Sequence, residues 1–331
     1  MTLDQISDFV ARQKQKILST GTIWSRFILL PDHDPLRHEL QHMIISDANI
    51  GMLVHKLQDP SLGIPSMLAT PADYRMYGSF YWVLRFLADI GITAEHLGIQ
   101  HLMQILLWQQ MEDGQFMIRY HRQKQQAISY ICLTAHLGYC LVRLGFRHSN
   151  AVAAAVNYIV TSQRWDGGWH CDRLKQPGEK LANAPSCPAA TVHIARLLSQ
   201  FDGHYEAMIA PAVRALMDLY PQSALFRCEL DPQLELNLSK LRYPPHYTGL
   251  DVLNVLHSIA PFARTIARPQ IDRLVEQTMN RWDGKGLLRS EKRIPEWAAF
   301  DFGRKQGGSD WITGLFIQAL ESIYFDHRAV A

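Results

Sequence analysis

The chain has 331 residues, of which 47% are hydrophobic and 19% are charged, and this balance excludes a disordered or fibrous protein. Lys and Arg together number 33 and Asp and Glu 31, which leaves a formal net charge of +2. Because there is no basic excess to neutralise phosphates, we expect no nucleic-acid partner. The 15 histidines bring metal binding into consideration.

The amino-terminal segment and the cysteines bear on the compartment. Residues 1–18 contain neither an uninterrupted apolar core nor a small-residue cleavage site, so they do not resemble a signal peptide. No window approaches the roughly 18 consecutive apolar residues of a spanning helix, so we expect no transmembrane segment and a cytoplasmic location. In a reducing cell we expect the five cysteines, at 132, 140, 171, 187 and 228, to be thiols, metal ligands or nucleophiles before they are disulfides.

Helices are predicted along the whole chain, because amphipathic stretches alternate with glycine-bearing loops and little strand-like alternation is present. A first helix is predicted over 3–18. More polar-faced helices are then predicted over 35–57, 95–111, 149–164, 205–219 and 268–282. Apolar helices alternate with them, over 77–90, 129–144, 187–201, 248–262 and 309–324. This two-helix period predicts an array of helical hairpins, either an open solenoid or a closed toroid.

A further motif recurs where two of the polar-faced helices end. Segments 110–116 and 163–169 both read Gln, three residues, Gly, one residue, aromatic; 280–286 is a decayed copy, and 58–63 is a candidate fourth. An Asp-Gly pair ends a helix because Gly adopts the left-handed conformation at low cost. We expect the Gln amide to reach backbone groups left unpaired at helix ends, and the aromatic ring to pack over the turn.

These Gln-x3-Gly-x-aromatic segments resemble the QW motifs of squalene–hopene and oxidosqualene cyclases and the related repeats of protein prenyltransferase β subunits. The resemblance covers roughly residues 35–325, and in that superfamily the motifs are structural. It implies an all-α fold, an (α/α) toroid of five to six helical hairpins that forms a single domain over 1–331. The apolar helices would form its inner ring and the polar-faced helices its outer ring.

In a ring of hairpins, the loops before the inner helices gather at one mouth, where the positive helix ends favour anions and thiolates. Cys171 follows the second Gln-Gly turn, Cys187 opens the next inner helix, and His246 precedes the one after it. Two thiolates and one imidazole make a three-ligand Zn²⁺ set with an open fourth position. The prenyltransferase β subunits carry an Asp-x-Cys and a His in corresponding positions; Cys187 and His246 resemble that Cys and His, whereas Pro185 stands in place of the Asp, and we expect Cys171 to replace it.

Each of these residues also has a plainer interpretation. Cys171 and Cys187 would be buried thiols, and His246 would cap its helix. Cys228 would supply a fourth ligand, which would close the site and make the metal structural. The candidate catalytic residues at this mouth are Asp172, Asp251 and Tyr247. Asp172 and Asp251 would orient the metal ligands, or are ordinary helix and turn residues.

Aromatic residues near the same mouth are candidates to hold an isoprenoid chain or to stabilise a cation, namely Tyr77, Tyr81, Tyr130 and Trp311. Their plainer interpretation is that they belong to the core. Proton-initiated cyclisation of the squalene–hopene type uses an Asp-x-Asp-Asp motif, which this sequence lacks.

Three functions follow from these observations. The first is a zinc-dependent enzyme that transfers a prenyl or other alkyl group to a metal-activated nucleophile, with a small-molecule, isoprenoid-like substrate and a partner protein subunit as in the prenyltransferases. The second is a metal-independent terpenoid cyclase-like or isoprenoid-binding protein. The third is a non-enzymatic scaffold with a structural metal.

Overall fold

The computed structural model describes residues 2–61, 63–65, 76–117, 119–121, 126–170, 186–219, 225–228, 231–237, 241–245, 251–282, 286–304 and 307–325. Its core is made of helices, which confirms the predicted all-α class. Two short antiparallel hairpins, which the sequence did not predict, pair β1 (Arg119–His121) with β2 (Gln126–Ile128) and β3 (Leu225–Cys228) with β4 (Asp231–Asn237). Strands β1, β2 and β3 have only three or four residues, too few to produce a recognisable alternating pattern.

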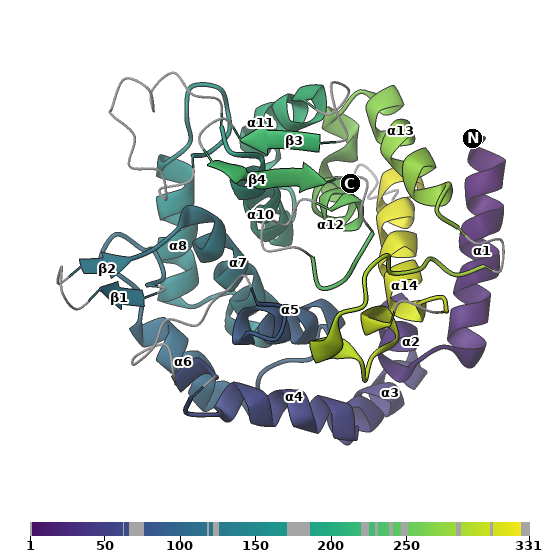
Figure 1. Ribbon diagram of the computed structural model, residues 1–331, viewed down its shortest axis with the longest axis horizontal. Helices are drawn as coiled ribbons and strands as arrows, with labels where there is room; N and C mark the ends of the chain where they lie inside the picture. Colours follow the sequence, from purple (N-terminus) through teal and green to yellow (C-terminus); the bar gives the residue numbers. More distant parts are fainter. Residues whose placement is uncertain are drawn as a thin grey trace.

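Six helices contact one another in succession and close a cycle (Figure 1). They are α2 (Ile23–Leu29), α5 (Phe80–Ile90), α7 (Ile131–Leu141), α10 (Pro188–Leu198), α12 (Val252–Ile259) and α14 (Asp310–Leu320). Each contacts the next, and α2 contacts both α14 and α5. All 11 residues of α5 and all 11 of α10 are buried, including the charged residues Arg85, Asp89 and Arg196. We call these six the inner helices.

The remaining α-helices surround the inner ones in Figure 1. They are α1 (Leu3–Thr20), α3 (Pro35–Ile45), α4 (Ala48–Gln58), α6 (Gln100–Trp108), α8 (Asn150–Thr161), α11 (Glu206–Leu219) and α13 (Arg268–Met279). Helix α13 buries Ile271, Leu274, Val275 and Thr278, which form one stripe at helical spacing. Within the part of the chain described above, no helix is both long enough and apolar enough to cross a bilayer.

The amino-terminal part differs from the predicted elements in two ways. The helix predicted over 35–57 is two helices, because Asp47 begins a new one by accepting hydrogen bonds from the backbone N–H groups of Asn49 and Ile50 at 2.8 and 3.2 Å. Helix α2 was not predicted, yet it packs against α1 and joins the inner cycle. Its seven residues are too few to show a helical period.

Several inner helices begin and end differently from the prediction. Helix α5 begins at Phe80 with Ser79 as its N-cap, and α12 begins at Val252 with Asp251 as its N-cap. Short 3-10 or π-helical turns extend four of the inner helices at their carboxyl ends. The π-helical turns are η3 (Val142–Phe146) and η9 (Glu321–Phe325), and the 3-10 turns are η4 (Ser199–Phe201) and η6 (Ala260–Thr265). These extensions account for the greater lengths that the apolar pattern predicted.

The two clear Gln-Gly segments form the same turn. The side-chain amide of Gln110 donates to the carbonyl oxygens of Gly114 and Ala151, at 2.9 and 2.6 Å. The amide of Gln163 donates to those of Gly167 and Met208, both at 2.8 Å. Ala151 and Met208 lie in the first turns of α8 and α11, so each Gln ties its turn to the start of the next outer helix.

The glycine and the aromatic residue of each turn also have the expected roles. Gly114 and Gly167 have φ angles of 93° and 83°, in the left-handed region that only glycine adopts at low cost. Phe116 and Trp169 are 1% and 0% exposed, and the Trp169 indole N–H donates to the Ile159 carbonyl at 2.7 Å. Gly284, in the decayed third copy, lies outside the described residues.

The space enclosed by the inner helices contains a cluster of aromatic side chains. Phe86 of α5 lies 5.0 Å from both Phe300 and Trp311 and 5.2 Å from Phe302, measured between ring centroids. Tyr243 packs against Phe302 at 4.9 Å. All five are at most 3% exposed, so the segment before α14 fills the middle of the molecule with rings.

Replacing Trp169 with Ala should lower the free energy of unfolding by roughly 3–5 kcal/mol, because a fully buried indole and its hydrogen bond are lost. Trp165 provides a matched control, since it lies four residues earlier and is 76% exposed; Trp165→Ala should change stability by less than about 0.5 kcal/mol. Urea unfolding followed by circular dichroism measures both. Equal effects of the two substitutions would contradict the structural role of the motif.

Candidate functional site

Of the predicted zinc ligands, Cys187 alone belongs to the described residues. It is the N-cap of α10, with Pro188 in the first turn as predicted, and its side chain is buried. Its backbone N–H donates to the Trp169 carbonyl at 2.7 Å. Within the described part of the chain, no three His, Cys, Asp or Glu side chains lie close enough together to hold a metal ion.

The other predicted residues of this mouth have different outcomes. Cys171, Asp172, His246 and Tyr247 lie outside the described residues, as does the side chain of Cys228. Asp251 is fully buried as the N-cap of α12, and its carboxylate accepts a hydrogen bond from the Asn254 backbone N–H at 3.1 Å. Burial raises the pKa of Asp251.

The four aromatic candidates lie in or against the core. Tyr81 and Trp311 are fully buried, whereas Tyr77 and Tyr130 are half-buried. The Trp297 indole N–H donates to the Tyr77 carbonyl at 2.7 Å, and Tyr130 is the N-cap of α7. None of the four lines a cavity found in the described part of the chain.

A buried carboxylate, that of Asp89, lies at the centre of a polar cluster near the other end of the inner helices. It accepts hydrogen bonds from the guanidinium groups of Arg85 and Arg196, at 2.8 and 2.9 Å. The phenol groups of Tyr139 and Tyr243 donate to it at 2.6 and 2.8 Å. Burial alone would raise the pKa of Asp89, but the two guanidinium charges hold it well below its usual range.

The two arginines of this cluster have further contacts. Their guanidinium carbons lie 5.0 and 4.9 Å from the centre of the Tyr139 ring, so both stack on the same aromatic residue. Arg85 also donates to the Asn254 side-chain oxygen at 2.8 Å. The cluster therefore joins α5, α7, α10, α12 and the segment 241–245, and we call it the Asp89 cluster.

Three histidines surround the Asp89 cluster and are neutral near pH 7. Burial, reinforced by the charges of Arg85 and Arg196, lowers the pKa of His136 and of His257 to about 3. Burial and the neighbouring His136 also lower the pKa of His193. The His136 Nε2 atom lies 2.9 Å from the Tyr81 carbonyl oxygen, so this nitrogen carries the ring proton.

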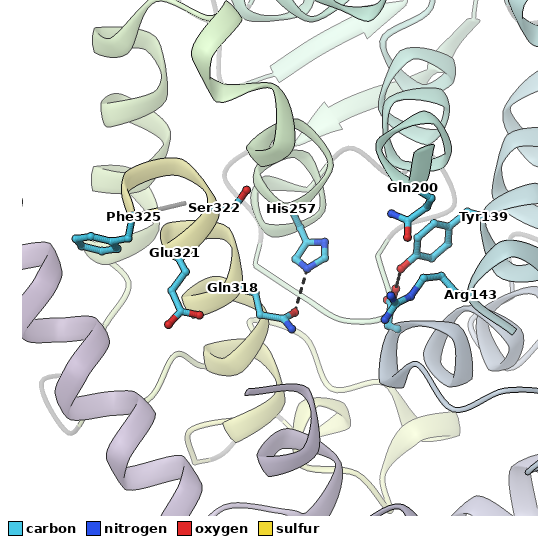
Figure 2. Close-up of a pocket in the computed structure, with 9 residues that line it drawn as sticks. Tyr139, Arg143, Gln200, His257, Gln318, Glu321, Ser322 and Phe325 are labelled. Carbon is cyan, nitrogen blue, oxygen red and sulfur yellow. Dashed lines mark hydrogen bonds between the residues drawn. The ribbon is translucent and has the colours of Figure 1, made fainter. Parts of the chain in front are cut away.

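A cavity of about 500 Å³ opens beside the Asp89 cluster (Figure 2). Residues from the carboxyl ends of five inner helices and their extensions line it, namely Asp89, Tyr139, Arg143, Gln200, His257, Gln318, Glu321, Ser322 and Phe325. It therefore lies at the end of these helices opposite to the mouth at which the sequence predicted a metal site.

The hydrogen bonds around this cavity determine what it can bind. The Gln318 amide nitrogen donates to the Ile28 carbonyl at 2.8 Å, which fixes the amide orientation. The Gln318 amide oxygen then lies 3.3 Å from His257 Nε2, so Nε2 carries the proton and donates to it. Nδ1 of His257 is then an acceptor, and Figure 2 shows it on the side of Tyr139 and Gln200. Arg143 makes no ion pair within the described residues. The cavity can accommodate a polar molecule that presents a donor to His257 and an acceptor to Arg143.

The residues of the Asp89 cluster were missed at the sequence level, although the sequence contains a signal. Arg85 and Asp89 stand four residues apart in a helix that is otherwise apolar on every side. Charged residues are almost never fully buried unless they are paired, so this spacing indicates an internal ion pair. Arg196 occupies an equivalent setting in α10.

No protein-family model matches this chain, and a comparison with curated proteins likewise finds no match. Among solved structures, the chain is similar to a crystal structure of a protein from Actinoplanes, at 15% sequence identity and a TM-score of 0.47. That alignment covers 96% of this chain and 99% of the other.

Replacing Asp89 with Asn should destabilise the protein by about 3–5 kcal/mol, because two buried guanidinium groups lose their counter-charge. The matched control is Glu321→Gln, which removes a carboxylate from the pair with Lys14 at 2.6 Å; both of those side chains are about one-third exposed. We expect the control to cost about 0–1 kcal/mol. If denaturant unfolding gives equal losses, the Asp89 carboxylate is not a structural centre.

The neutral histidines should make stability fall in mild acid. In the unfolded chain they take up protons below pH about 6.5, whereas folded His136 and His257 do so near pH 3, so stability is fully present above pH 6.5 and is lost as the pH falls towards 3. Each histidine contributes a slope of up to about 1.4 kcal/mol per pH unit. Urea unfolding between pH 7.5 and about 5.5 measures this slope before the carboxylates of the unfolded chain take up protons.

The variant His136→Gln isolates one of these contributions. Glutamine can donate the hydrogen bond to the Tyr81 carbonyl but does not titrate. The slope of unfolding free energy against pH should therefore decrease by the contribution of one histidine, up to about 1.4 kcal/mol per pH unit. This holds whatever the stability of the variant at pH 7.5. An unchanged slope would show that folded His136 takes up its proton as readily as the unfolded chain does.

Proposed function

We propose that the chain is an (α/α) toroid of the kind found in terpenoid cyclases and prenyltransferase β subunits. The closed cycle of contacts among the six inner helices supports this arrangement. The repeated Gln-Gly turns support it further, because each attaches an outer helix to its successor in the same way. Packing of α1 against α2 supplies a sixth pair beside the five predicted hairpins.

Within this toroid, we propose a zinc-dependent enzyme whose metal is held by Cys171, Cys187 and His246. The observation that carries the proposal is the position of Cys187, which is buried at the amino end of α10, where the helix dipole favours a thiolate. Two sulfurs and one imidazole nitrogen match the ligands that zinc prefers and leave a fourth position open.

Contacts at both ends of the cysteine-bearing loop support the same site. The Cys187 N–H donates to Trp169, which is two residues from Cys171 in the sequence. Asp166 accepts hydrogen bonds from the Ser186 N–H and hydroxyl, at 2.7 and 2.6 Å. The residues that flank 171–185 are thus tied together at the amino end of α10.

A zinc ion in this position would lower the pKa of a bound thiol or water. The chemistry that fits is transfer of a prenyl or other alkyl group to that nucleophile in a reducing, cytoplasmic setting, with an isoprenoid-like small molecule as donor and a partner subunit in the complex. A protein that binds an isoprenoid without metal, or a scaffold in which Cys228 completes a structural metal site, would give different results in the following experiment.

We expect about one zinc per chain after purification without added metal. Cys187→Ala should remove most of this zinc, because the remaining ligands cannot hold the ion tightly, whereas Cys132→Ala, on the half-buried thiol of α7, should retain it. Elemental analysis by mass spectrometry, with circular dichroism to verify folding, measures both variants. Absence of zinc from the parent would favour the metal-independent alternative, and full zinc in Cys187→Ala would remove Cys187 from the site.

The number of ligands separates the enzyme from the scaffold. X-ray absorption at the zinc edge should report two sulfur ligands if the fourth position is open, and three if Cys228 closes the site. Loss of one sulfur in Cys228→Ala would support the structural metal.

A further inference from the structure

A much smaller cavity lies next to the Asp89 cluster. Its volume is about 10 Å³, and it is lined by Arg85, Arg196, Arg242, Tyr243, Pro245, Leu253, Asn254, His257 and Leu315. Three of these nine residues are arginines and none is a carboxylate. A volume of this size holds about one water molecule or one monatomic ion.

Each of the three arginines has a buried nitrogen without a hydrogen-bond partner. These atoms are Nη1 of Arg85, Nε of Arg196 and Nε of Arg242. Arg85 and Arg196 are 1% and 3% exposed, so their nitrogens have no access to bulk water. Because buried donors in native proteins almost always have a partner, three such donors around one cavity indicate an acceptor in it.

The charges around the cavity do not balance. Arg85 and Arg196 share one carboxylate, that of Asp89, while Arg242 makes no ion pair within the described residues and donates only to the Tyr77 hydroxyl, at 3.3 Å. Among the described residues, a second buried acid, Asp251, interacts electrostatically with Arg242. Three positive charges thus face two carboxylates, neither of which lines the cavity. An unpaired charge in such surroundings is costly unless a counter-ion accompanies it.

We propose that this cavity binds a small inorganic anion, of the size and charge of chloride. A halide accepts several hydrogen bonds at once and supplies the missing negative charge. Water would satisfy the donors but leave the charge uncompensated. Phosphate, sulfate and organic carboxylates are too large for a volume of about 10 Å³, and Leu253, Pro245 and Leu315 line the cavity beside the arginines.

Stability measured against chloride concentration tests the proposal. Sodium gluconate, whose anion is too large for the cavity, replaces sodium chloride at constant ionic strength. An anion that binds the folded state alone stabilises it in proportion to its occupancy, so chloride at 10 times its Kd should raise the folding equilibrium constant about 11-fold. The effect should saturate, and bromide should reproduce it. Identical unfolding curves in chloride and gluconate would overturn the proposal and leave water as the occupant.

Two variants separate the cavity from the protein surface. Arg242→Gln removes one charge of the cavity, so the gain from chloride should largely disappear. Arg12→Gln removes the same charge from an exposed pair on α1, where the side chain is 67% exposed, and should retain the gain. An equal gain in both variants would place the chloride effect on the surface and contradict the proposal.

Diffraction tests the proposal on the parent protein, so its result does not depend on whether a variant folds. Crystals of the parent protein grown in sodium bromide should show an anomalous peak between Arg85, Arg196 and Arg242. Absence of that peak, with bromide visible elsewhere on the molecule, would overturn the proposal. Because neither measurement involves the metal, a failure here would leave the zinc proposal unaffected, and loss of the zinc proposal would leave the anion site unaffected.

Discussion

The Asp89 carboxylate is the constraint on which the arrangement of the inner helices depends. It receives hydrogen bonds from α5, α7, α10 and the segment before α12, all between 2.6 and 3.0 Å. Moving any of these elements by an ångström would leave a buried charge without a partner, which costs more than a lost apolar contact. The cluster therefore selects one mutual position of the helices, whereas apolar packing alone would tolerate several.

The same cluster explains why the nearby core is polar and yet contains neutral histidines. Two guanidinium groups close to one carboxylate leave a positive field, and a protonated imidazole in that field would be repelled and poorly solvated. His136, His193 and His257 are neutral for this reason, and each can act as an acceptor through one ring nitrogen. The number of histidines in the sequence suggested metal binding, but these three pack around the buried arginines.

Local sequence signals predicted those parts of the fold that depend on neighbours in the chain. The Gln-Gly turns were predictable because the Gln amide, the left-handed Gly and the aromatic ring all act within seven residues, and Pro188 correctly placed Cys187 at a helix start. Helix α2 and the break at Asp47 were missed, since one is too short to show periodicity and the other depends on a single cap. The Asp89 cluster joins Asp89 to Tyr139, Arg196 and Tyr243, which lie 50, 107 and 154 positions away, a juxtaposition that periodicity does not encode.

The two ends of the inner helices favour different kinds of ligand, because the helix dipoles give them opposite partial charges. Their amino ends carry a positive dipole that suits the thiol of Cys187, and their carboxyl ends suit the cations Arg143 and Arg196, which lie there. Between the two ends, the rings of Phe86, Phe302 and Trp311 fill the interior. A substrate for the proposed metal at the amino ends would therefore approach from that side, and the cavity beside His257 lies at the opposite ends of the helices.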